Sequence, residues 1–250
     1  MGTSTSSRGS GGKSPLVPPW ADTDGKGPGP EPPPKRFGPF RRQLGEFVSS
    51  GDGGALRKAL GHYARQATGG RTVGPRRFGS MVQVGGALFD ALTTLQTGAI
   101  PPDLELETLD GIDVDVAIQA LVEALLPENG DAERIRVAII EAMSECLEGF
   151  EEFDFTKITH DMVVKVVVAY LSACVFGQVM LESNRAFSKA AEAGRLEQAE
   201  NDMRSLVRAS VDKHLHPALA GRKRLSGKDV EQAQRRALTE VWTEWEAYES

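Results

Sequence analysis

The stretch 12–14, Gly-Lys-Ser, has the residue types that end a phosphate-binding loop, in which backbone N–H groups cradle the phosphates of a nucleotide. The full pattern needs a glycine five positions before Gly12, where this chain has Ser7. It also needs a strand before the loop and a helix after it, and neither is expected in this Gly/Ser-rich segment. Without a rigid loop the N–H groups do not converge, so the sequence argues against nucleotide binding here.

Two further patterns contain residue types that ligate metals. His214 and His216 stand two positions apart, which puts them on different faces of a helix, and a proline follows at once, so the helix is expected to end there. A cationic histidine at that end complements the helix dipole. Asp110, Asp113 and Asp115 alternate as in a calcium loop, but the central glycine and the glutamate at position twelve are missing, so we expect them to cap a helix.

The two cysteines, Cys146 and Cys174, lie in helical patterns without CxxC spacing and without histidines nearby in sequence. This arrangement argues against a disulfide or a zinc site and favours two small buried side chains in a reducing cytoplasm. No other set of residues forms a convincing nucleophile, base or acid. We therefore expect a protein that is not an enzyme and that needs no metal and no cofactor.

The N-terminus is the more specific feature. Gly2 is small enough for Met1 to be removed, which leaves a glycine amine, and an α-amine titrates near neutrality, so that a useful fraction is nucleophilic. Residues 1–6 also fit the N-myristoylation pattern M-G-x-x-x-[ST], which matters only where the transferase exists. A modified amine, a lipid-anchored adaptor and an unmodified start are the three alternatives.

Residues 1–36 are expected to form a disordered arm. Gly, Pro, Ser and Thr fill 23 of the first 34 positions, so this segment has too little apolar surface to offset its ordering entropy. One apolar island interrupts it, consisting of Pro15, Leu16, Val17, Pro18, Pro19 and Trp20. Proline favours an extended polyproline conformation and lowers the entropic cost of docking, so the island is a candidate partner-binding motif.

From residue 37 to 250 the apolar residues recur at helical spacing, and one all-α, bundle-like domain is expected. The longest helix should begin after Thr159 as its N-cap and reach about residue 191; its Val-rich start is ambiguous with a strand, but the continuation favours a helix. Its apolar stretch 162–181 nearly has the length of a membrane span, yet the charge of Lys165 and the lack of basic flanks indicate a core helix. Ser226 has capping-box spacing before the last helix, in which Trp245 is expected to contact the core.

Other expected helices are less regular. One should run from about 75 to 98, and the glycines 79, 85 and 86 inside it suggest an interruption.

Charge is segregated along the chain. Residues 35–77 have a balance of +8 and residues 90–161 a balance of −15, whereas the whole chain has −6. The two regions either pair within the fold or form docking surfaces for partners. The basic stretch has no array of aromatics for stacking bases, so nucleic acid is not expected as a direct ligand.

The start MGTSTSS, the island Pro15–Trp20 and the helical remainder together resemble QatB, the B component of the bacterial Qat anti-phage defence system. The resemblance implies three partners: a P-loop ATPase, a QueC-like enzyme of 7-deazaguanine chemistry and a TatD-like nuclease. It further implies that Gly2 accepts a deazaguanine group, with Thr3, Ser4 and the island as recognition elements. A cytoplasmic, non-catalytic subunit without a membrane span is the expectation that follows.

Overall fold

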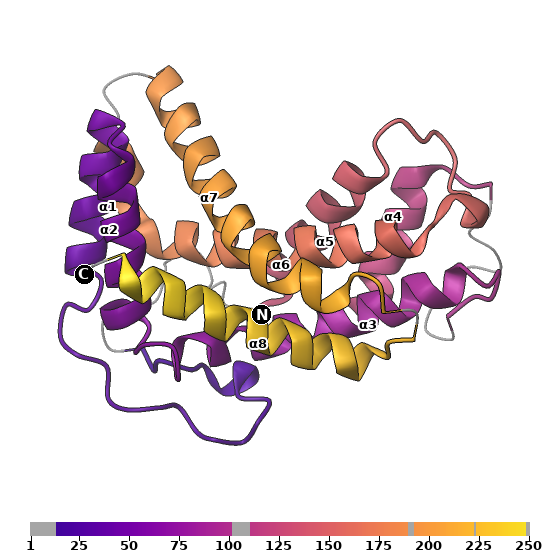
Figure 1. The fold of residues 1–250 in the computed structure, drawn as a ribbon, viewed down its shortest axis with the longest axis horizontal. Helices are drawn as coiled ribbons and strands as arrows, with labels where there is room; N and C mark the ends of the chain where they lie inside the picture. The colour runs from indigo at the N-terminus through magenta and orange to yellow at the C-terminus, as the bar shows by residue number, and fades with distance from the viewer. Residues whose placement is uncertain (1–13, 102–110, 190–192, 223, 249–250) are drawn as a thin grey trace, which may run out of the picture.

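The computed structural model describes residues 14–101, 111–189, 193–222 and 224–248 of the chain. Eight α-helices and no strand are found among these residues (Figure 1), which confirms the expected all-helical class. The helices are α1 (Gly38–Ser50), α2 (Gly53–His62), α3 (Gly79–Leu95), α4 (Val114–Leu125), α5 (Ala132–Cys146), α6 (His160–Ser183), α7 (Ala193–Leu219) and α8 (Gly227–Ala247).

Local caps define several helix starts. The Thr159 hydroxyl accepts a hydrogen bond from the N–H of Met162 (3.2 Å), and Ser226 forms a reciprocal capping box with Asp229 at the start of α8. Each cap satisfies an N–H group that has no partner inside the helix. Both caps confirm the sequence prediction, whereas α6 ends at Ser183, earlier than the expected residue 191.

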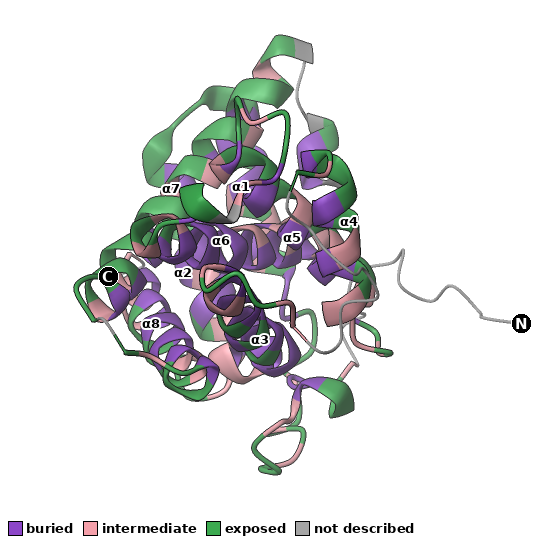
Figure 2. Ribbon diagram, turned by 90° about the vertical axis from the view of Figure 1, so that its right-hand side faces the viewer, coloured by how far each residue is buried: buried purple, intermediate pink, exposed green. Residues whose placement is uncertain are grey.

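Helix α6 lies at the centre of the domain, where α3, α5 and α7 pack against it, and α8 packs in turn on α3 and α7. Figure 2 shows the buried faces of α3, α6 and α8 turned inward. By length and composition α6 could cross a membrane, but 78% of its most apolar window is buried inside the protein. In this fold α6 is therefore a core helix, as the sequence indicated.

Two tryptophans of α8 close the core. Trp242 and Trp245 have no exposed surface, and their ring centroids lie 5.2 Å apart. Each indole N–H finds an acceptor, Thr68 Oγ1 at 2.8 Å for Trp242 and Ser210 Oγ at 3.1 Å for Trp245. The core position expected for Trp245 is confirmed, and Trp242 shares it.

The glycines of α3 do not interrupt it, because the helix is continuous from Gly79 to Leu95. They allow close approach of α8 instead. A Cβ on Gly86 would lie 2.6 Å from the carbonyl oxygen of Gly227, and one on Gly85 would lie 2.8 Å from Nε2 of Gln234. The expected interruption was wrong for Gly85 and Gly86, whose missing side chains serve helix packing, whereas Gly79 marks the point at which a 3-10 turn (Gly74–Phe78) passes into α3.

Glu244 of α8 ties the last two helices together. Lys213 Nζ (2.8 Å) and His214 Nε2 (3.1 Å) contact its Oε2, and Tyr248 donates its hydroxyl to Oε1 (2.6 Å). Partial burial raises the pKa of Glu244, but these hydrogen bonds outweigh burial and lower the pKa from 4.5 to about 2. The carboxylate thus stabilises the fold above pH 4.5, and this contribution is lost as the pH falls towards 2.

We expect Glu244→Gln to lower the free energy of unfolding at pH 7 by about 1 kcal/mol, because the partners are partly solvated. The difference from the unmodified protein should shrink as the pH falls below 4.5. Urea unfolding at a series of pH values measures this, with Glu240→Gln on an exposed position of α8 as control. A pH-independent difference between the two variants would contradict the assignment.

Candidate docking site on the N-terminal arm

The stretch from Ser14 to Arg36, expected to belong to the disordered arm, lies on the helical domain (indigo at the lower left of Figure 1). Leu16, Val17 and Ala21 are buried, with at most 1% of their surface exposed. The N–H of Val17 donates to the carbonyl of Pro28 (3.1 Å), which closes residues 17–28 into a loop. Composition alone predicted disorder. Proline restricts the backbone and so lowers the conformational entropy lost on ordering, and a few apolar side chains gain contacts on the surface of the folded domain.

Three glycines of the helical domain make room for this loop. A Cβ on Gly69 would lie 2.8 Å from Leu16 Cδ1, and one on Gly130 would lie 2.7 Å from the ring of Trp20. A Cβ on Gly79, the first residue of α3, would collide with the carbonyl oxygen of Ala21. Any larger residue at these positions would push the loop away.

Polar contacts fix the rest of the loop. Asp22 accepts hydrogen bonds from Arg76 Nη2 (2.7 Å) and from the N–H groups of Lys26 (3.1 Å) and Gly27 (2.7 Å). The hydrogen bond from Arg76 is the main cause of the lowered pKa of Asp22. Arg235 of α8 reaches over to donate to Thr23 Oγ1 (2.8 Å). The loop is therefore held by Arg76, in the turn before α3, and by Arg235 of α8.

The island is divided between a buried and an exposed half. Leu16 and Val17 face the domain and are closed to a partner, whereas Pro15 and Pro19 are exposed and Trp20 keeps 44% of its surface in solvent. Gly2, Thr3 and Ser4 lie outside the described residues. The sequence did not show which half of the island is buried. Gly79 at the start of α3 was a possible signal that another segment, here Ala21, approaches the helix closely.

The other chemical candidates have structural positions. Asp113 Oδ1 accepts the N–H of Asp115 (2.9 Å) and caps α4, as expected. His214 contacts Glu244, whereas His216 is exposed in the last turn of α7, which continues to Leu219 beyond the proline. Asp110 and the stretch 12–13 lie outside the described residues. Among the described residues, no three His, Cys, Asp or Glu side chains form a group that could hold a metal ion.

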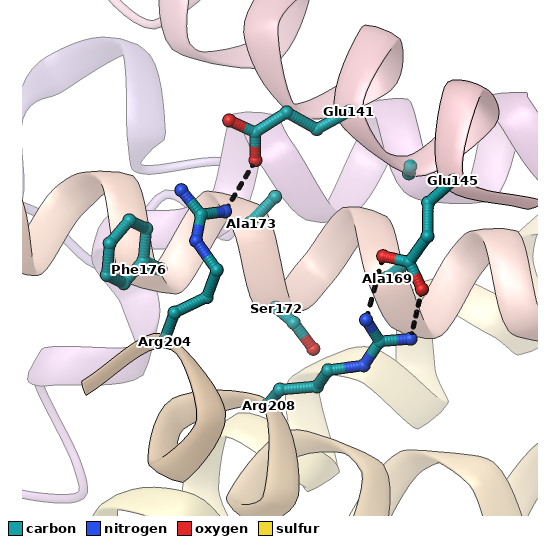
Figure 3. A pocket seen from close by; sticks show the side chains of 9 residues that line it. Glu141, Glu145, Ala169, Ser172, Ala173, Phe176, Arg204 and Arg208 are labelled. Carbon is teal, nitrogen blue, oxygen red and sulfur yellow. Dashed lines mark hydrogen bonds and ion pairs between the residues drawn. The ribbon is translucent and has the colours of Figure 1, made fainter. Parts of the chain in front are cut away.

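A small pocket of about 40 Å³ lies between α5, α6 and α7 (Figure 3). Arg204 and Arg208 of α7 reach Glu141 (2.8 Å) and Glu145 (2.6 Å) of α5, and the Arg204 guanidinium also lies 4.1 Å from the Phe176 ring centroid. The volume of this pocket suits one or two waters rather than a substrate. These half-exposed ion pairs clamp two helices across α6 and contribute modestly to stability.

The same contacts bear on the two charged regions. Glu141 and Glu145 of the acidic region pair with α7, and Arg77 of the basic region pairs with Glu182 of α6. These ion pairs connect each region to a third part of the chain. The charge of Asp131 in the acidic region also helps to raise the pKa of Arg77, so the two regions interact at this point, and partner docking of their other charges stays a hypothesis.

The fold and the docked loop together define an all-helical protein whose N-terminal segment is rooted on its own domain. A comparison with family models supplies the particular family: residues 69–245 match QatB, described as the Qat anti-phage system associated protein QatB. The chain belongs to this family and is thus a component of an anti-phage defence system. The match covers the helical domain from α3 to α8 and leaves α1 and α2 outside, whereas the resemblance noted from the sequence rested mainly on the arm. Comparisons with curated proteins and with solved structures gave no match.

Proposed function

We propose that this protein is a non-catalytic, cytoplasmic subunit of its defence system that presents its N-terminal arm to a partner enzyme. The observation that carries the proposal is the burial of Leu16 and Val17, which fixes the root of the arm on the helical domain. Gly2 lies 14 positions before Leu16. A chain of this length reaches at most roughly 50 Å when fully extended, far enough to enter the pocket of a docked enzyme.

The partner that fits the family resemblance is a QueC-like enzyme, and the group transferred is of the 7-deazaguanine type. Gly2 is the acceptor because its free amine is a nucleophile near neutral pH. Thr3 and Ser4 are adjacent recognition residues. Trp20, which keeps 44% of its surface in solvent, offers the aromatic anchor that protein interfaces favour, and Pro15 and Pro19 belong to the same exposed half. The P-loop ATPase and the TatD-like nuclease of the system are further partners for the helical domain.

Co-expression with the neighbouring genes followed by intact-mass analysis tests the proposal. We expect a mass increase that maps to the N-terminal peptide and requires the QueC-like gene. Gly2→Leu should abolish the increase, because a large second residue retains Met1 and moves the amine. Gly11→Ala, which changes another glycine of the same arm, should leave it intact.

A free Gly2 amine in the presence of every partner gene would overturn the modification and leave a scaffold that binds partners without it. A mass increase equal to a myristoyl group would instead support the lipid-anchored alternative. One such chain gives only marginal membrane binding, so a basic patch such as residues 35–77 would have to assist.

A further inference from the structure

Arg36, where the loop meets α1, is an unusual buried cation. Only 2% of its surface is exposed, and its three guanidinium nitrogens are buried without a hydrogen-bond acceptor. The guanidinium group lies over the Phe37 ring in a cation–π contact, with 4.8 Å between its carbon and the ring centroid. A buried guanidinium without acceptors is costly, and such a group in a native protein calls for an additional partner.

The carboxylate that acts electrostatically on Arg36, Glu182, is already engaged. Both oxygens of Glu182, which is fully buried, have partners: Arg77 on Oε1 and the Tyr63 hydroxyl on Oε2 (2.7 Å). Arg41 donates to the backbone carbonyl of Glu182 (2.9 Å) rather than to its side chain. Burial lowers the pKa of Arg36, and repulsion from Arg77 lowers it further, although Glu182 acts in the opposite direction. The Glu182 charge thus acts on two buried cations, and Arg77 holds one of its oxygens.

Arg36 also lines a groove of about 580 Å³ between the proline-rich segment 30–35 and residues 65–69. Lys35 and Arg65 line the same groove, and Glu31 is the acidic residue among them. Several prolines form an apolar wall. The volume lies in the range of small-molecule sites, and the charge of the lining favours an anion.

The backbone beside Arg36 has an uncommon conformation. Among the described residues, only Lys35 (φ 55°) and Asn184 (φ 53°) are non-glycine residues with positive φ. Lys35 directly precedes Arg36 in the chain, and Asn184 follows Glu182 by two positions. Such conformations often persist where a segment clamps a ligand.

We propose that this groove binds a small molecule that carries a phosphate group, with Arg36 as the buried anchor. The guanidinium fork matches two oxygens of a phosphate, and the ligand charge compensates the second buried cation. Lys35 and the exposed Arg65, whose Nη2 also donates to the carbonyl of Glu246 (2.8 Å), add positive charge to the lining. Because the Arg36 nitrogens are closed to bulk water, binding includes a shift of the segment 30–35.

Thermal unfolding with sodium pyrophosphate as probe, against sodium chloride at equal ionic strength, tests this site in the full chain. Pyrophosphate should raise the Tm of the unmodified protein, and Arg36→Met should lose this rise, with affinity by calorimetry reduced at least about tenfold. Without the probe, Arg36→Met should be no less stable than the unmodified protein, because it removes a buried charge that has no hydrogen bonds. The matched control, Arg42→Met on an exposed position of α1, should keep the full response.

A pyrophosphate response no larger than that of sodium chloride, or a response that Arg36→Met retains, would overturn the site. Lys35→Met provides a second test should Arg36→Met fail to fold, because Lys35 is exposed at the entrance. It should weaken binding in part, and an unchanged affinity would count against the proposal. Adenosine triphosphate, pyrophosphate and adenosine, compared as probes, distinguish a nucleotide from a free oxyanion; binding of adenosine alone would contradict the role of the phosphate.

Discussion

Replacing Glu182 by glutamine will destabilise the protein by about 3–5 kcal/mol, because the substitution removes the negative charge that acts on the buried guanidinium groups of Arg36 and Arg77. Glu182 lies near the end of α6 with no exposed surface, and it holds Arg77 through one oxygen and Tyr63 through the other. Burial disfavours the charged form of Arg77, but Glu182, together with smaller effects of Tyr63 and Asp131, outweighs burial and raises the pKa of Arg77 above its ordinary value. The carboxylate therefore connects α6 to the segment before α3 and to the end of α2.

Urea unfolding at pH 7 measures the effect. Tyr63→Phe removes one hydrogen bond to the same carboxylate and no charge, so its cost should be only about 1 kcal/mol. The ratio between the two variants separates loss of charge from loss of a hydrogen bond. A free energy of unfolding for Glu182→Gln that equals that of Tyr63→Phe would show that the buried arginines do not need this charge.

Features encoded by neighbouring residues could be predicted from the sequence. The N-caps Thr159 and Ser226 act within three residues, and the apolar stripe of α8 required a core contact for Trp245. The all-helical class followed from the same periodicity. These predictions needed no knowledge of which helices touch, since helix signals repeat over short distances.

Features that depend on contacts distant in sequence could not be predicted in this way. Arg36 stood in a basic stretch that is usually a solvated face, and the carboxylate that acts on it once it is buried, Glu182, lies far along the chain. Likewise, the composition of residues 14–36 indicated disorder because it contains no information about the glycines 69, 79 and 130 that accommodate the loop. The sequence thus indicated the island as a candidate site, but it did not indicate that Leu16 and Val17 anchor the island on the domain.

Gly79→Ala should release the loop from the domain. The added Cβ would collide with the carbonyl oxygen of Ala21 and lie 2.7 Å from Thr23 Oγ1, and the loop cannot simply move aside because Arg76 and Arg235 hold it. Overpacking of this kind costs about 1–3 kcal/mol. Local opening should rise accordingly, so trypsin cleavage after the exposed Lys26 should be faster by roughly tenfold.

Gly177→Ala is the matched control, because a Cβ at this position within α6 meets no atom within 4 Å. Alanine in a helix interior is preferred over glycine, so this variant should be more stable by about 0.5–1 kcal/mol and keep the slow cleavage after Lys26. Equal cleavage rates for both variants would show that the close approach of Ala21 to α3 does not hold the loop. If Gly79→Ala alone also lowers the yield of modified Gly2 in co-expression, the anchored root contributes to presentation of the arm, and an unchanged yield would assign recognition to the first residues alone.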